Sequence, residues 1–210
     1  MNYVWLNIFS VLFVFAMAII SPGPNFILVV NTAINRSRRE GAYTAAGVAV
    51  GSMLFAIAGL LGFLLLINSS IYFATIIHYL GSGYLLYLGI KMMLEINKTA
   101  NRLHSHSNIA SHSGCFGCFF RGLLTNMTNP KAWAFYISLF ALVGSPEFPL
   151  WAKCFLCLSV FAMAMCWYGT ITFMMTDERV KSRFMSSQKW LNLIFGVILT
   201  LLGGKLLFAG

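Results

Sequence analysis

The stretch IISPGPNFILVV, residues 19–30, places two prolines and a glycine inside a long apolar run. No charged residue occurs between positions 4 and 34, whereas about 20 apolar residues are enough to span a bilayer. A proline lacks the backbone N–H and disrupts the hydrogen bond of the carbonyl four residues earlier. Because lipid cannot satisfy such groups, a break of this kind persists only against protein or a water-filled cavity. The stretch therefore predicts a membrane helix that is broken where it faces something polar.

The composition of the whole chain supports an integral membrane protein. Hydrophobic residues make up 59% and charged residues 9% of the 210 positions, with a mean hydropathy of +0.80. Soluble domains average about 45–50% apolar and 25% charged residues. The apolar runs predict six transmembrane helices, at residues 4–34, 42–67, 71–94, 119–143, 151–175 and 191–208.

Weak internal similarity suggests that the six helices form two repeats. LGIK at 88–91 and LGGK at 202–205 both end a third helix, and SPGPN at 21–25 corresponds to TNPKAW at 128–133. Because each repeat has three helices, the second copy is inverted in the membrane, an arrangement typical of transporters. The predicted fold is therefore all-α, with two inverted three-helix repeats (1–94 and 119–210), broken helices 1 and 4, and a polar His/Ser-rich linker at 95–118.

The chain has a net charge of +9, and the placement of its basic residues is explained by membrane topology. Basic residues cluster after helix 1, between helices 3 and 4, and after helix 5. The positive-inside rule then places these loops and the linker in the cytoplasm and both termini on the outside. The lipid bilayer is thus the expected partner, and no nucleic acid is expected.

The two helix breaks are the candidate substrate site. Ser21 could cap a helix that starts at Pro22, and Asn129 could cap one that starts at Pro130. Both breaks would lie near the bilayer midplane, where helix N-termini attract an anionic group such as a carboxylate. Lys131 is a basic residue deep in an apolar run, and a functional role is favoured for it over snorkelling of its side chain to the interface. The candidate substrate-binding residues are Ser21, Pro22, Gly23, Pro24, Asn25, Asn126, Asn129, Pro130 and Lys131.

The polar groups around the breaks suit a zwitterion. None of the five acidic residues lies deep in a predicted span, so a substrate ammonium would need backbone carbonyls or asparagine oxygens. His78 is the one histidine in a span, and packing is favoured over proton coupling for it. Aromatic residues could line a path through the membrane, although packing is the favoured role of each: Trp133, Phe135, Tyr136, Trp167 and Tyr168.

Small residues at four-residue spacing predict close helix contacts. They are Gly47 and Gly51 in helix 2, and Gly196, Thr200 and Gly204 in helix 6. Packing within one chain is favoured, and a homo-oligomer is the alternative.

Histidine and cysteine residues leave two other functions open. A divalent heavy-metal exporter could use the linker residues His104, His106, His112, Cys115 and Cys118. A membrane thiol-redox protein could use Cys115 and Cys118 together with Cys154 and Cys157, but these pairs should lie on opposite sides of the membrane. The sequence lacks a phosphate-binding loop. We expect no catalytic residues, no cofactor and no metal site.

Several segments resemble the LysE-type amino-acid exporters, in particular their homoserine/threonine-resistance branch. They are ISPGPNFILVVNTAINRSRREG, GVAVGSMLFAIAGLLG, GSGYLLYLGIKMM and FFRGLLTNMTNPKAWAFYISLFALVG. The resemblance implies six helices, a bacterial inner-membrane location and export of small amino acids driven by the proton-motive force. Its P-G-P element falls on Pro22, Gly23 and Pro24, its N-P-K element on Asn129, Pro130 and Lys131, and its helix 2 glycines on Gly47 and Gly51.

One position departs from the pattern of the family. Members often carry Asp directly after P-G-P, whereas this chain has Asn25. Asn25 lacks the carboxylate that would carry a proton or recognise a cationic group. The sequence therefore predicts a secondary exporter of small neutral amino acids, of the threonine or homoserine type, that works by alternating access around the two breaks.

Overall fold

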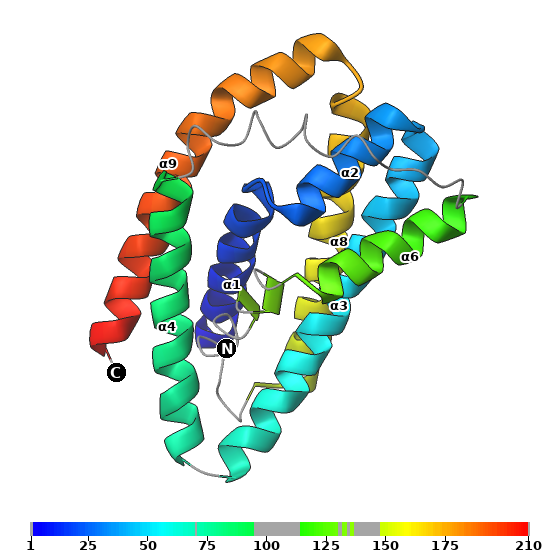
Figure 1. Cartoon of the computed structure of the whole chain (residues 1–210). Coiled ribbons are helices and arrows are strands. Elements are labelled where there is room, and N and C mark those ends of the chain that lie inside the picture. The colour runs from blue at the N-terminus through cyan, green and yellow to red at the C-terminus, as the bar shows by residue number, and fades with distance from the viewer. Residues whose placement is uncertain are drawn as a thin grey trace.

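The computed structural model describes residues 2–69, 71–94, 114–129, 132–133, 135–136 and 148–209, and most of these residues are helical. Further helical turns lie at 132–133 and 135–136, and none of the described residues forms a strand. The helices, shown in Figure 1, are α1 (Asn2–Ile20), α2 (Pro24–Asn35), α3 (Arg38–Ser69), α4 (Ile71–Leu94), α6 (Gly114–Met127), α8 (Leu150–Met174) and α9 (Glu178–Ala209).

Four segments among the described residues are long and apolar enough to cross a membrane. They are Tyr3–Ile20, Arg38–Leu60, Leu150–Met174 and Lys189–Phe208. The expected all-helical fold is thereby confirmed for the described residues, with four candidate membrane spans. The arrangement of six spans in two inverted repeats stays a prediction.

The first helix is broken where the sequence predicts it, but the new helix starts at Pro24 and not at Pro22. Gly23 is its N-cap, with φ −145° and ψ −173°, and its carbonyl accepts the first helical hydrogen bond from Ile27 at 3.0 Å. The expectation that Ser21 caps a helix beginning at Pro22 is wrong. The reason is steric, because a residue that precedes proline is pushed out of the helical region, and Gly23 precedes Pro24.

A second break follows α6. The N–H of Asn129 bonds to the carbonyl of Asn126 at 3.1 Å, a tighter turn than in an α-helix. The Asn129 carbonyl then accepts the N–H of Trp133 at 3.1 Å, so a new helical turn begins at Asn129, as the sequence predicts. Pro130 and Lys131 lie outside the described residues.

Several helices begin earlier than the apolar runs indicate, α6 and α9 by the most. The helix expected from residue 119 begins at Gly114, whose positive φ of +48° suits glycine. The helix expected from residue 191 begins at Glu178. Phe184 anchors this added segment of α9, since its ring stacks on Phe26 at 5.7 Å and lies 6.1 Å from the ring of Trp167.

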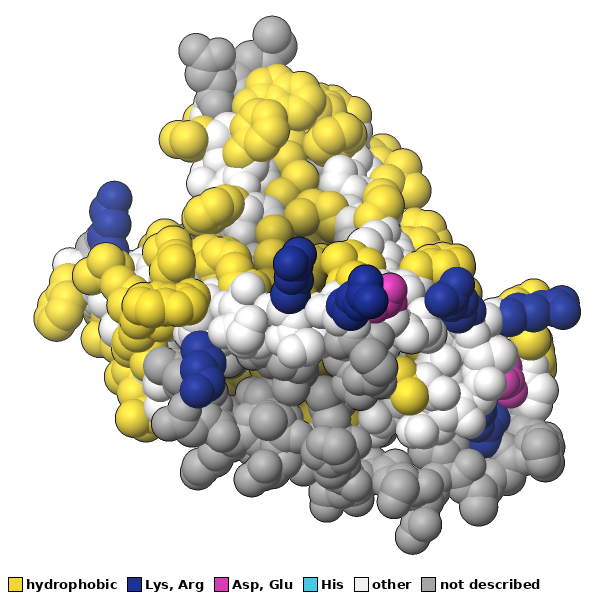
Figure 2. Space-filling view, turned by 90° about the horizontal axis from the view of Figure 1, so that it is seen from above, with side chains coloured by type: hydrophobic (Ala, Val, Ile, Leu, Met, Phe, Trp, Pro, Cys, Tyr) yellow, Lys and Arg dark blue, Asp and Glu magenta, His cyan; other side chains and the backbone are white. Residues whose placement is uncertain are grey.

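Helix α3 starts with a serine N-cap. The Ser37 hydroxyl accepts the N–H of Glu40 at 3.1 Å, and it donates to the Glu40 carboxylate at 3.0 Å. That carboxylate also lies 3.6 Å from Arg36. Figure 2 looks onto this end of the molecule, where Lys and Arg side chains are spread over the face.

Helix packing divides the molecule into two groups. Helix α3 packs on α6, α8 and α2, whereas α4 packs mainly on α9 (Figure 1). Both contacts use glycine. A Cβ at Gly47 would overlap the carbonyl oxygen of Phe119 in α6, and one at Gly196 would lie 2.8 Å from the carbonyl oxygen of Gly89 in α4.

The expected packing role of Gly204 differs from what the structure shows. Open space surrounds the position of a Cβ at Gly204, while one at Gly203 would lie 2.7 Å from the backbone nitrogen of Leu86. Adjacent helical residues point about 100° apart. Only the packing against α4 therefore decides which of the two glycines makes the contact.

Candidate functional site

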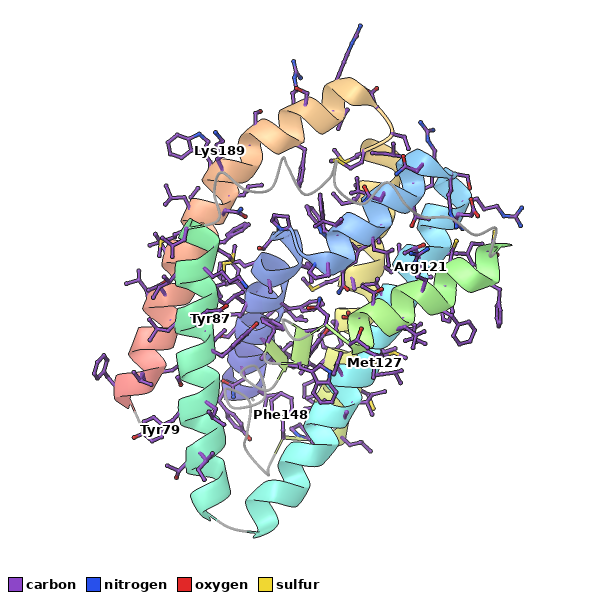
Figure 3. The ribbon with its side chains drawn as sticks, viewed as in Figure 1. Tyr79, Tyr87, Arg121, Met127, Phe148 and Lys189 are labelled. Carbon is purple, nitrogen blue, oxygen red and sulfur yellow. The ribbon has the colours of Figure 1, made fainter. Side chains whose placement is uncertain are left out.

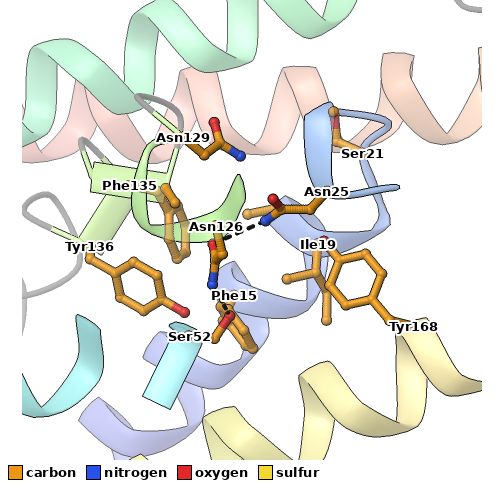
Figure 4. Close-up of a pocket in the computed structure, with 13 residues that line it drawn as sticks. Phe15, Ile19, Ser21, Asn25, Ser52, Asn126, Asn129, Phe135, Tyr136 and Tyr168 are labelled. Atoms are coloured by element: carbon orange, nitrogen blue, oxygen red, sulfur yellow. Dashed lines mark hydrogen bonds between the residues drawn. The ribbon is translucent and has the colours of Figure 1, made fainter. Parts of the chain in front are cut away.

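A cavity lies between the two helix breaks. It measures about 430 Å³, its open mouth included. Met127, the last residue of α6, lies well inside the bundle, away from the end marked by Lys189 (Figure 3). The cavity is lined by Phe15, Ala18, Ile19, Ser21, Gly23, Asn25, Ser52, Asn126, Asn129, Ala132, Phe135, Tyr136 and Tyr168 (Figure 4).

Two asparagines connect the breaks directly. The amide nitrogen of Asn25, in the first turn of α2, donates to the amide oxygen of Asn126 in α6 at 3.0 Å. The Asn126 nitrogen in turn donates to the Val48 carbonyl at 2.8 Å and to the Ser52 hydroxyl at 3.0 Å, both in α3. Asn25 is 8% exposed and Asn126 1%. One buried network thus joins α2, α3 and α6 across the cavity.

Aromatic rings line a large part of the cavity. Tyr136 stacks on Phe55 of α3 at 5.2 Å, and Phe15 of α1 lies 6.0 Å from Phe135 and 6.1 Å from Tyr136. Rings pack in these tilted and offset arrangements because of their quadrupoles. The rings hold the helical turn after the second break against α1 and α3.

Trp133 closes the second break from outside the cavity. Its indole N–H donates to the Met127 carbonyl at 2.7 Å, and its ring meets Phe55 edge-on at 5.0 Å. The Met127 carbonyl lies at the end of α6, where helical carbonyls lack a regular partner. Trp133 therefore supplies a donor where lipid offers none.

The structure brings together five of the predicted site residues in the cavity lining: Ser21, Gly23, Asn25, Asn126 and Asn129. Pro22 and Pro24 shape the first break but do not line the cavity. Pro130 and Lys131 lie outside the described residues.

Sequence reasoning missed several lining residues. Ser52 and Phe15 carry no local signal, because only the contact between helices turns them toward the breaks. Phe135, Tyr136 and Tyr168 line the cavity, although packing was the favoured role for them. No residue that lines the cavity within the described part of the chain is charged.

The histidines and cysteines contribute nothing to this cavity in the described part of the chain. The five cysteines are free, and no group of three or more His, Cys, Asp or Glu side chains among the described residues could hold a metal ion. Cys118 instead lies beside the ion pair at the start of α3, with its sulfur 3.6 Å from Arg36 and 3.9 Å from Glu40. His104, His106 and His112 fall outside the described residues, as does the side chain of His78.

The chain is similar to several known transporters. The threonine efflux protein of Salmonella typhi is 29% identical over 191 residues, which cover 90% of this chain and 92% of that protein. The threonine efflux protein of Escherichia coli (strain K12) is 28% identical over 190 residues, or 90% of this chain and 91% of that protein. The leucine efflux protein of Salmonella choleraesuis is 31% identical over 141 residues, or 67% of this chain and 62% of that protein.

No solved structure gives a significant match. The LysE type translocator family matches residues 16–210, which include both helix breaks and every described residue of the cavity except Phe15. On this match, the chain belongs to the LysE type translocator family.

Proposed function

We propose that the protein is a secondary transporter that exports small neutral amino acids, of the threonine or homoserine type, by alternating access. The observation that carries this proposal is the cavity between two helix breaks, lined by polar residues from both halves of the chain. The relatives are named for efflux of threonine and of leucine, and neither name points to metal export or thiol chemistry.

The helix ends at the cavity supply the carboxylate site in this proposal. Gly23 has no side chain to cap α2, and Pro24 has no N–H. The N–H groups of Asn25 and Phe26 precede the first helical bond, which Ile27 donates. Such N–H groups, together with the positive end of the helix dipole, bind anions. Lys131 would add a positive charge from the second break, and Asn129 and Pro130 would shape that side.

The proposal also covers location and topology. We place the chain in the bacterial inner membrane, with both termini in the periplasm and the linker between α4 and α6 in the cytoplasm. The exposed Arg38, Arg39, Arg179 and Arg183 at the starts of α3 and α9 would then lie on the cytoplasmic side. The two halves, 1–94 and 119–210, would be inverted repeats around the cavity. The family consists of translocators, and we assign no catalytic step and no cofactor.

Transport by inverted membrane vesicles tests the function. Vesicles from cells that make the protein should accumulate labelled threonine more strongly than vesicles from control cells, and an uncoupler should abolish the difference. Pro24→Ala combined with Lys131→Ala should remove the uptake, whereas deletion of residues 102–113 should leave it largely intact. Equal accumulation with and without the protein, for threonine, homoserine and leucine alike, would refute the proposal.

A further inference from the structure

We propose that the side-chain oxygen of Asn25 accepts the substrate's ammonium group, and that Asn126 is a positioning residue that turns this oxygen into the cavity. The inference rests on the proposed function and assigns one pole of the substrate to one atom. It follows from the direction of the hydrogen bonds in the asparagine network.

The Val48 carbonyl fixes the direction of that network. A carbonyl only accepts hydrogen bonds, so the group of Asn126 that lies 2.8 Å from it must be the amide nitrogen. The Asn126 oxygen then faces α2, where it lies 3.0 Å from Asn25. A reversed Asn126 amide would place two oxygens against each other at Val48. The orientation of Asn126 is therefore set from α3.

This direction determines what Asn25 presents to the cavity. Because the Asn126 oxygen needs a donor, Asn25 must turn its nitrogen toward it. The Asn25 oxygen has no hydrogen-bond partner among the described residues. That oxygen is buried, and Figure 4 shows the Asn25 side chain between Asn126 and Ser21 in the cavity.

An oxygen in this state favours a ligand that donates hydrogen bonds. Leaving a buried acceptor unsatisfied is costly, and a hydrogen bond to a charged group contributes more than one between neutral groups. A substrate ammonium would donate a hydrogen bond to this oxygen. No described residue that lines the cavity is charged, so no protein cation competes for the oxygen. The N–H groups of Asn25 and Phe26 at the start of α2 remain for the carboxylate.

The site should therefore require both a free ammonium group and a carboxylate in its ligand. The expected ligand class is the zwitterionic α-amino acid with a short neutral side chain. N-acylated amino acids keep the carboxylate and the side chain but have no ammonium, so the site should exclude them.

The test uses the purified full-length chain in proteoliposomes, with labelled threonine and labelled leucine as substrates. Unlabelled threonine should compete, and N-acetylthreonine should compete at least about tenfold more weakly, as expected for the loss of one charged hydrogen bond. This comparison needs only the wild-type protein. Equal competition by the two compounds would overturn the assignment of the ammonium, although transport itself would still support the proposed function. If neither labelled amino acid is transported, the proposed function fails.

Variants distinguish a loss of substrate recognition by the two asparagines from a general loss of folded protein. Asn25→Ala and Asn126→Ala should each raise the KM for threonine about tenfold or more and should reduce the discrimination against N-acetylthreonine. Asn31→Ala is the matched control, because Asn31 is buried on the same helix but does not line the cavity. A loss of folded protein would lower the maximal rate and leave the discrimination unchanged. Full discrimination in the Asn25→Ala protein would refute the role of its oxygen.

Discussion

The contact between α3 and α6 at Gly47 allows a prediction about stability. Two glycine-to-alanine substitutions, at Gly47 and at Gly169, should change the stability of the protein in opposite directions. A Cβ at Gly47 would overlap the Phe119 carbonyl oxygen and lie 2.8 Å from the Leu123 nitrogen, and both atoms belong to the backbone of α6. Backbone cannot rotate away as a side chain does, so Gly47→Ala must push the two helices apart. In contrast, nothing lies within 4 Å of the Cβ position at Gly169 in α8.

The expected sizes follow from two opposing effects. Replacing glycine with alanine inside a helix stabilises it by about 1 kcal/mol. Overfilling a packed contact costs about 1–3 kcal/mol, and the overlap with backbone places Gly47→Ala at the upper end of this range. We therefore expect Gly47→Ala to lose about 2 kcal/mol, whereas Gly169→Ala should gain up to about 1 kcal/mol.

SDS-induced unfolding in mixed micelles, with both variants measured beside the wild type, checks this prediction. Gly47→Ala should also weaken threonine transport, because moving α6 draws Asn126 away from Val48 and Ser52. If Gly47→Ala proves as stable as Gly169→Ala, the close approach of α3 and α6 is not as described.

Two other contacts give predictions of their own. Trp133→Phe keeps an aromatic ring but removes the hydrogen bond to the Met127 carbonyl, so it should lower the stability in detergent by about 1 kcal/mol. Trp190→Phe is the control and should leave the stability unchanged, because Trp190 is 68% exposed. Equal melting temperatures of the two variants would contradict the role of the Trp133 indole N–H. Ser37→Ala removes the cap that binds the Glu40 N–H and should cost about 1 kcal/mol in the same assay. Ser37→Thr should retain most of that stability, and a neutral Ser37→Ala would show that the cap contributes nothing.

Much of the fold could be predicted because the relevant signals are local. The helix predicted at 71–94 has these bounds in the structure, and the one predicted at 151–175 differs by one residue at each end. The start of α9 could not be predicted in this way, since residues 178–188 are mostly polar and Phe184 packs against the distant residues Phe26 and Trp167.

Some residues of the candidate site also carry a local sequence signal, and others do not. Ser21, Gly23, Asn25, Asn126 and Asn129 could be named because they flank prolines in apolar runs. Ser52 could not, since its role depends on which face of α3 meets α6. Likewise, the choice between Gly203 and Gly204 depends on the position of α4.

The sequence by itself determined that this chain is a helical membrane protein and that its first helix must break near Pro24. Both conclusions follow from properties of single residues, namely their hydropathy and the missing N–H of proline. Only the tertiary structure decided how the asparagine amides at the cavity are oriented. The Val48 carbonyl of α3 orients Asn126 of α6, and Asn126 orients Asn25 of α2. Which end of an asparagine amide donates depends on its partner in another helix. That partner is far away in the sequence, so the local sequence does not show how the amide is oriented.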